Sequence, residues 1–193
     1  MLIISCHADT GFSSHALTHL PGGIVEGHLD NFSGVYSVMK AYFSGRLTAD
    51  HLRIELTYGE EKGLIGAYEL AKTIKPTDVV LVVDVTGTPT KKDIVVEKCK
   101  NPAMQSYLKT AFEELSYDLY ANCPDPISDC DETDAYSPVT PYTCFLGIPC
   151  EGGDYNAGMV RCTLKTLDAV AEAICRLNAA FPQFCKDHNL PLR

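Results

Sequence analysis

Short apolar runs alternate along the chain with segments of helical spacing, and this alternation is what most restricts the fold. Strand-like runs cover residues 2–6, 52–58, 78–84, 94–96 and 143–146. Helical patterns open at 30, 62, 104 and 164. Strands that alternate with helices predict an α/β protein, a three-layer sandwich around a mainly parallel, mixed sheet. We expect residues 1–193 to form a single catalytic-type domain.

Charge and apolar content restrict the partners. The formal net charge is −9 with a pI near 5.0, whereas nucleic-acid and anionic membrane surfaces need clustered Lys and Arg. No apolar run approaches the ~20 residues of a membrane span. The first residues, Met1–Cys6, are too short for a secretory core and have no basic lead-in. We therefore expect a cytoplasmic protein with no nucleic-acid or membrane partner.

The nine cysteines form no Cys-x-x-Cys pair, which argues against a zinc ribbon or a thioredoxin-type redox site. Without an export signal they are expected to be reduced thiols. Most, such as Cys175 within a helical pattern, are expected to pack as small buried hydrophobes. Cys6 precedes His7 directly, and strand alternation predicts that its side chain faces away from His7.

Residues that bind metals follow three of the apolar runs. His7 and Asp9 follow the first, Glu60 and Glu61 the second, and Asp84 ends the third. Ligands of open α/β sheets bind outside the carboxyl ends of the strands, so these side chains are predicted to meet in one crevice. Imidazole and carboxylates together suit zinc, with manganese or cobalt as alternatives.

Each of these residues also has a structural interpretation. His7 could be a hydrogen-bonded histidine at a strand end, and Asp84 could begin a turn into Thr86-Gly87. Asp30 begins a helix and could be its N-cap, a position that Asp favours. The Glu60-Glu61 pair could be the solvated first turn of a helix, where negative charge is favourable. Their joint occurrence at strand ends favours the metal site.

Four motifs carry a resemblance to a known superfamily. They are His7-x-Asp9, Gly27-x-x-Asp30-Asn31-x-Ser-Gly, Glu60-Glu61-x-Gly-Leu-x-Gly and the strand-terminal Asp84. In order and spacing they resemble the co-catalytic zinc exopeptidases, which include leucyl, glutamyl and deblocking aminopeptidases, peptidase T and acyl-amino-acid deacylases. The resemblance implies the zinc-exopeptidase core, of the phosphorylase/hydrolase-like type. Only twenty residues lie between Asp9 and Asp30, so we expect a minimal form without the inserted lid domain.

The resemblance also implies roles for individual residues. Asp30 would bridge two zinc ions, His7 and Asp84 would complete the ligands of one ion, and Glu61 would bind the other. Glu60 would be the general base that accepts a proton from a metal-bound water. Asp9 would hydrogen-bond His7 and fix its tautomer.

One expected ligand is missing from the chain. Members of the superfamily have a histidine near the last strand, but residues 150–159 contain none. Counting back from Leu164, Asn156 is the best match, although an amide oxygen is a poorer zinc ligand than imidazole. Asp154 is the alternative replacement and would give an oxygen-richer second site. Otherwise the second position is weak or empty, so one or two ions are expected.

The sequence thus predicts a metal-dependent amide hydrolase, an aminopeptidase acting on short peptides. The alternatives are a deacylase of N-acyl amino acids and a catalytically silent metal-binding homologue. A homo-oligomer that closes the crevice is compatible with all three. Residues 122–141, rich in Pro, Asp, Ser and Thr, are predicted to be a long loop bordering the site, and 132–135 resemble a Thr-Asp-Ala element of some relatives.

Overall fold

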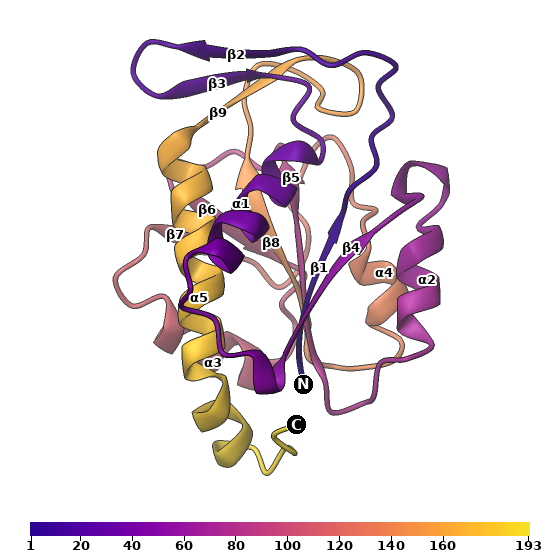
Figure 1. Cartoon of the computed structure of the whole chain (residues 1–193), viewed down its shortest axis with the longest axis vertical. Coiled ribbons are helices and arrows are strands. Elements are labelled where there is room, and N and C mark those ends of the chain that lie inside the picture. Colours follow the sequence, from indigo (N-terminus) through magenta and orange to yellow (C-terminus); the bar gives the residue numbers. More distant parts are fainter.

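A six-stranded sheet forms the centre of the molecule, with strand order β4-β1-β5-β8-β6-β7 (Figure 1). The computed structural model describes the backbone of residues 1–193 and every side chain except that of Ala49. The strands are β1 (Leu2–His7), β4 (Leu52–Thr57), β5 (Val79–Thr86), β6 (Ile94–Glu97), β7 (Tyr117–Leu119) and β8 (Thr143–Pro149). β4, β1, β5 and β8 are parallel, whereas β6 is antiparallel to β8. The predicted mainly parallel, mixed sheet is confirmed.

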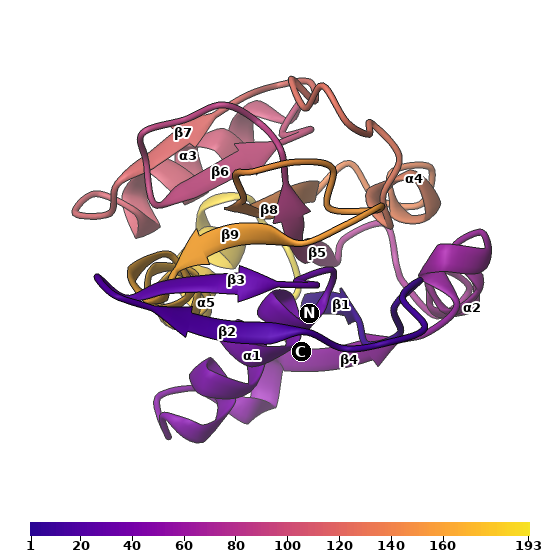
Figure 2. The ribbon, with the colours of Figure 1, turned by 90° about the horizontal axis from the view of Figure 1, so that it is seen from above.

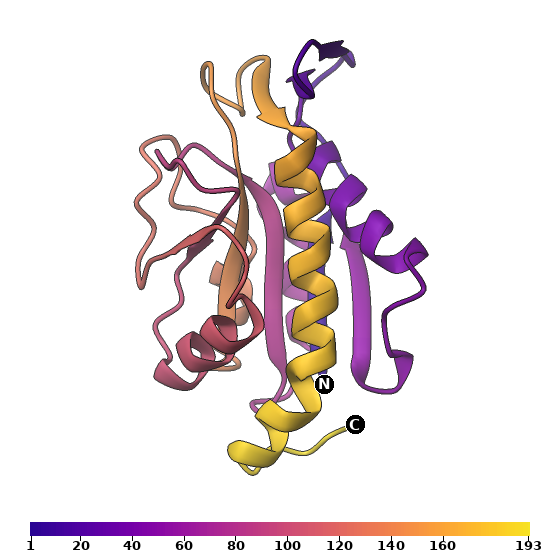
Figure 3. The same cartoon turned by 90° about the vertical axis from the view of Figure 1, so that its left-hand side faces the viewer.

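Helices cover both faces of this sheet. On one face lie α1 (Phe32–Phe43), α3 (Pro102–Ala111) and α5 (Leu164–Asp187), and Figure 3 shows the long α5 running along the strands. On the other face lie α2 (Ile65–Ala71) and α4 (Thr133–Tyr136). The 3₁₀ turns η1 (Ala49–His51) and η2 (Glu60–Lys62) flank β4. The predicted three-layer α/β architecture is confirmed.

Alternation along β1 assigns its side chains to the two layers. Leu2, Ile4 and Cys6 belong to the core beneath α1, α3 and α5, and Ile3 belongs to the core beneath α2 and α4. Cys6 is therefore a core residue, as predicted. His7 shares the α2/α4 side with Ile3, because side chains two residues apart point to the same face.

A second, three-stranded antiparallel sheet comprises β2 (Leu17–Leu20), β3 (Ile24–Gly27) and β9 (Val160–Thr163). Figure 2 shows it lying across one end of the large sheet. β2 and β3 form a hairpin, which is not among the strand-like runs identified in the sequence. β2 has no buried side chain, so it gives no apolar alternation to detect in the sequence.

Several predicted boundaries also shift. β5 and β8 extend beyond the predicted runs, to Thr86 and Pro149. The predicted loop over residues 122–141 contains the short helix α4. α5 begins at Leu164, where a helical pattern was predicted to open, and continues to Asp187 with Pro182 inside it. Of the helices in the described chain, none combines the length and apolarity that a membrane crossing requires.

Candidate metal centre

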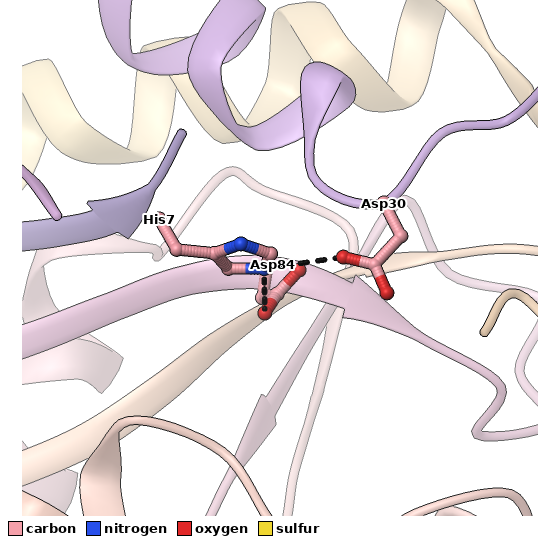
Figure 4. Close-up of side chains that lie close together, drawn as sticks. All are labelled: His7, Asp30 and Asp84. Atoms are coloured by element: carbon pink, nitrogen blue, oxygen red, sulfur yellow. Dashed lines mark hydrogen bonds and ion pairs between the residues drawn. The ribbon is translucent and has the colours of Figure 1, made fainter. Parts of the chain in front are cut away.

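His7, Asp30 and Asp84 converge at the carboxyl ends of β1 and β5 (Figure 4). His7 Nε2 lies 3.1 Å from Asp84 Oδ2 and 3.1 Å from Asp30 Oδ1. One ligand atom from each residue lies within 4.8 Å of the others, and all three residues are buried. β1 and β5 are adjacent parallel strands, so their ends meet at one edge of the sheet.

The other ring nitrogen of His7 faces Asp9. His7 Nδ1 lies 3.2 Å from the Asp9 backbone oxygen and 3.5 Å from Asp9 Oδ1. A carbonyl oxygen only accepts hydrogen bonds, so Nδ1 carries the hydrogen. In the neutral imidazole this tautomer leaves the lone pair on Nε2, where it faces the two carboxylates.

Asp30 is held by the turn that begins α1. The neighbouring Asn31 donates through Nδ2 to the Val83 backbone oxygen at 2.8 Å and accepts through Oδ1 from Gly34 N at 3.0 Å. A Cβ on Gly34 would lie 2.1 Å from Asn31 Oδ1, which explains why this position requires glycine. Thr10 Oγ1 donates to the Asp30 backbone oxygen at 2.8 Å. These contacts tie Asp30 to β5 and to the segment after β1.

Glu60 and Glu61 lie in η2, which follows the edge strand β4. Glu60 lines the same cavity as Asp30 and Asp84, and its backbone N–H donates to Asp9 Oδ1 at 3.3 Å. Glu61 is more exposed, and Gly11 N donates to its Oε1 at 2.8 Å. The two adjacent carboxylates therefore have different surroundings.

Burial and charge act together on the titratable groups. Burial lowers the pKa of His7, but the adjacent Asp84 and Asp30 carboxylates more than offset this and raise it to about 12. Burial raises the pKa of Glu60 to about 8, in spite of His7, and the carboxylates of Asp84 and Asp30 add to the increase. Burial also raises the pKa of Asp84, again against the effect of His7. The site thus gathers carboxyl groups where burial disfavours their charged forms unless a positive charge lies beside them.

Asn156 and Asp154 occupy different positions. Asn156 lines the cavity that contains Asp30, Glu60 and Asp84. Asp154 does not line it, and its Oδ1 accepts a hydrogen bond from Asn156 N at 2.9 Å within the turn after β8. Of the two replacements considered for the missing histidine, only Asn156 borders the cavity.

The opposite wall of the cavity is also acidic. Glu97 Oε1 accepts from Thr86 Oγ1 at 2.7 Å, and Asp125 Oδ2 accepts from Tyr155 OH at 2.9 Å. Sequence analysis missed these residues. Glu97 ends β6, which runs antiparallel to β8, so the rule of parallel strand ends does not point to it. Asp125 lies in the segment 122–141, which was predicted to border the site and does.

The donor set fits a divalent cation. Asp30 Oδ1 is buried and accepts no hydrogen bond in the described part of the chain, although it lies close to His7 Nε2. A buried carboxylate oxygen without a donor is costly unless a cation binds it. One imidazole nitrogen and two carboxylates are also ligands that zinc accepts.

Comparison with known proteins agrees with this fold and site. The model of peptidase family M28 matches residues 1–137, which include His7, Asp30, Glu60, Glu61 and Asp84. The chain belongs to peptidase family M28. This confirms the resemblance to the co-catalytic zinc exopeptidases. A comparison with curated protein sequences gives no match.

Solved aminopeptidase structures share the fold. The TET aminopeptidase from the marine sediment archaeon Thaumarchaeota archaeon SCGC AB-539-E09 is similar with TM-score 0.69 at 15% identity, over 88% of this chain and 55% of that one. Aminopeptidase APDkam598 from the archaeon Desulfurococcus kamchatkensis gives TM-score 0.71 at 17% identity, over 90% and 54%. Yeast aminopeptidase 1 (Ape1) gives 0.61 at 11%, over 92% and 50%. This chain spans about half the length of these relatives.

Proposed function

We propose that this protein is a metal-dependent amide hydrolase, an aminopeptidase that acts on short peptides. The observation that carries the proposal is the convergence of His7, Asp30 and Asp84 at 3.1 Å contacts, beside Glu60 in one cavity. Membership of peptidase family M28 supports the reaction class. We further propose that residues 1–193 act as a single catalytic unit in the cytoplasm.

His7, Asp30 and Asp84 would hold a zinc ion, with manganese or cobalt as alternatives. Bound there, the cation would supply Lewis-acid activation of water and of the scissile carbonyl. His7 would bind through Nε2, with Nδ1 held by Asp9. Glu60, in the same cavity, would accept the proton of the attacking water and deliver it to the leaving amine.

Asp30 and Glu61 would hold a second ion, with Asn156 as the further candidate ligand. Asn156 rather than Asp154 is proposed, because only Asn156 lines the cavity. An amide oxygen is a weaker zinc ligand than imidazole, so this second position would bind weakly. Replacing Asn156 by histidine should raise the zinc content toward two ions per chain. The matched variant Asp154→Asn should leave the zinc content unchanged.

The charge of the cavity separates two substrate classes. Carboxyl groups line both walls, among them Asp30, Glu60, Asp84, Glu97 and Asp125. A peptide presents a cationic α-amine to this cavity, whereas an N-acyl amino acid presents a carboxylate that like charges would repel. This favours an aminopeptidase over the deacylase alternative.

The decisive experiment measures hydrolysis of an aminoacyl chromogenic substrate and of an N-acyl amino acid, with and without chelator. Elemental analysis of the same sample reports the bound metal. The proposal expects cleavage of the aminoacyl substrate that chelator abolishes. Activity that survives complete metal removal would refute the mechanism. A protein with neither metal nor activity would be a silent homologue, and preference for the N-acyl amino acid would make it a deacylase.

Replacing Glu60 by glutamine tests the general base. This variant should lose about 10²- to 10⁴-fold in kcat while the metal content stays nearly unchanged, because general-base catalysis contributes that much. Glu113→Gln is the control, since Glu113 is exposed in the turn after α3 and does not line the cavity. Loss of metal in the Glu60 variant would show that the roles of Glu60 and Glu61 are reversed.

A further inference from the structure

Two buried thiols lie at the base of the loop that carries Asn156. Cys150 directly follows β8, and Cys162 lies within β9, so the two residues enclose the turn over residues 151–159. Figure 1 shows this connection passing from the large sheet to the small one. Gly152 and Gly153, both with positive φ, lie in the same turn, and Asn156 and Tyr155 line the acidic cavity. The two thiols therefore lie at the two ends of the segment that contributes Tyr155 and Asn156 to the cavity.

Backbone register places the two cysteines directly opposite each other. Glu151 N donates to Arg161 O at 2.8 Å, and Arg161 N donates to Glu151 O at 2.7 Å. Glu151 and Arg161 therefore form a hydrogen-bonded antiparallel pair, and Cys150 and Cys162 are the next, non-hydrogen-bonded pair. Cα atoms at such a position are about 4.5 Å apart, within the roughly 4.4–6.8 Å that disulfides span.

We propose that Cys150 and Cys162 form a reversible disulfide that clamps the Asn156 loop to β9. The protein has both as free thiols, and both line an open surface hollow of about 830 Å³ bordered by Gly87 and Ile127. A small disulfide reagent therefore has a path to them. The inference rests on the proposed function only for the importance of Asn156, and the thiol chemistry is independent of it.

The two thiols differ in reactivity. An interaction with the Cys150 thiol lowers the pKa of Cys162, against the effect of burial. The same interaction raises the pKa of Cys150, and burial and the carboxylates of Asp30 and Asp84 raise it further. Cys162 is therefore the thiol that reacts first, since the thiolate is the nucleophile.

The exchange needs a low-molecular-weight disulfide as oxidant. The Cys162 thiolate attacks one sulfur of the reagent, breaks its S–S bond and releases one small thiolate, which leaves a mixed disulfide on Cys162. Cys150 then loses its proton to that released thiolate or to solvent and attacks the Cys162 sulfur, and the second small thiolate departs. Two electrons pass from the protein dithiol to the reagent, so one reagent disulfide becomes two small thiols.

A second pair in the chain provides a matched control. Cys99 and Cys144 also interact with each other, but both are fully buried and neither lines the hollow. If proximity alone decided oxidation, both pairs would react, whereas access for the reagent favours Cys150 and Cys162. The variants Cys162→Ala and Cys144→Ala separate the two pairs.

The test treats the full chain with oxidised glutathione, blocks the remaining thiols by alkylation, and maps disulfide-linked peptides by mass spectrometry. We expect a Cys150–Cys162 link that dithiothreitol removes, that Cys162→Ala abolishes and that Cys144→Ala retains. The Tm of the oxidised protein should rise by roughly 5–10 °C, because the link lowers the conformational entropy of the unfolded chain. Chymotrypsin should cleave the loop more slowly in the oxidised form.

Other results would overturn the proposal. Complete alkylation of Cys150 and Cys162 after oxidation would show that the bond does not form. A link between Cys99 and Cys144, or between Cys123 and Cys130, in its place would assign the reactivity elsewhere. An unchanged Tm and cleavage rate in linked protein would show that the bond clamps nothing. None of these readouts requires hydrolysis, so they leave the proposed function to its own assay.

Discussion

Replacing Glu132 by alanine should lower the free energy of unfolding by about 2–4 kcal/mol, through the loss of buried hydrogen bonds. Glu132 has no exposed surface. Its Oε2 accepts from Ser5 Oγ at 2.8 Å and its Oε1 accepts from Thr57 Oγ1. Tyr136 OH lies 2.8 Å from Ser5 Oγ and completes the network. The carboxylate therefore connects β1, β4 and α4 below the candidate metal centre.

The magnitude follows from what alanine removes. A hydrogen bond to a charged acceptor contributes about 1.5–3 kcal/mol, and two such bonds are lost. Removing the buried side chain also leaves a cavity, which adds to the cost. The alanine variant no longer bears the cost of burying a carboxylate, and this offsets part of the lost stability. Glutamine keeps the shape and offers one acceptor and one donor, which the rotating hydroxyls of Ser5 and Thr57 can both meet, so Glu132→Gln should cost less than about 1 kcal/mol.

The pH dependence of this effect has a definite sign. Burial raises the pKa of Glu132 above its ordinary value of 4.5, although the Thr57 and Ser5 hydroxyls lower it in part. The native state then holds the proton more tightly than the unfolded state, so stability falls as pH rises from about 4.5 through the native pKa. The contribution of this group is fully present below pH 4.5. The free energy of unfolding that Glu132→Gln loses relative to the wild type should therefore be smaller at pH 7.5 than at pH 5.

Urea unfolding followed by far-ultraviolet circular dichroism measures these differences, since the chain contains no tryptophan. The wild type, Glu132→Ala and Glu132→Gln are compared at pH 5 and pH 7.5. An alanine variant within about 0.5 kcal/mol of the wild type would refute the reasoning, as it would show that water replaces the carboxylate without loss. Equal destabilisation by alanine and glutamine would refute it as well, because shape and hydrogen bonding would then not matter.

Three further predictions concern packing, ion pairing and metal. Gly66→Ala should cost about 1–3 kcal/mol, since its Cβ would lie 2.7 Å from Tyr58 N, whereas Gly158→Ala meets nothing nearer than 4.0 Å; equal Tm values would contradict this. Arg46 lowers the pKa of Glu172 to about 2. The Glu172–Arg46 ion pair should therefore contribute at most about 1 kcal/mol to the free energy of unfolding at this exposed site, and this contribution is present above pH 4.5 and lost toward pH 2. A Glu172→Gln variant with the same free energy of unfolding as the wild type at pH 7 would disprove this contribution. Chelator should lower the Tm and zinc should restore it, and an insensitive Tm would argue against a bound ion.

The main features of the fold could be predicted from buried segments alone. β1 and β5 are buried throughout, and such continuous apolar runs identify central parallel strands. The hairpin β2–β3 could not be predicted in this way, because its outer strand buries no side chain and is held by backbone pairing with β3. Pairing of this kind depends on the partner strand, which local sequence does not reveal.

The residues of the candidate site that lie at the ends of parallel strands or in a recognisable motif could be predicted from the sequence. His7 and Asp84 follow from the rule of strand ends, and Asp30 follows from its motif. Glu97 reaches the cavity from an antiparallel strand, and Asp125 reaches it from a loop held by Gly87 N and Tyr155 OH. Such approaches are set by tertiary packing, so only the structure reveals them.

The position of β1 between β4 and β5 bears on how the chain acquires its shape. During synthesis β1 emerges before both of its neighbours, β4 and β5, which lie at least 45 residues later in the sequence. The newly made β1 therefore has no partner strand until β4, which ends at Thr57, has left the ribosome, and it lacks the second until β5, which ends at Thr86, has followed. Parallel pairing over such distances is slow, so nascent chains of this protein should depend on chaperones that cover the first strand.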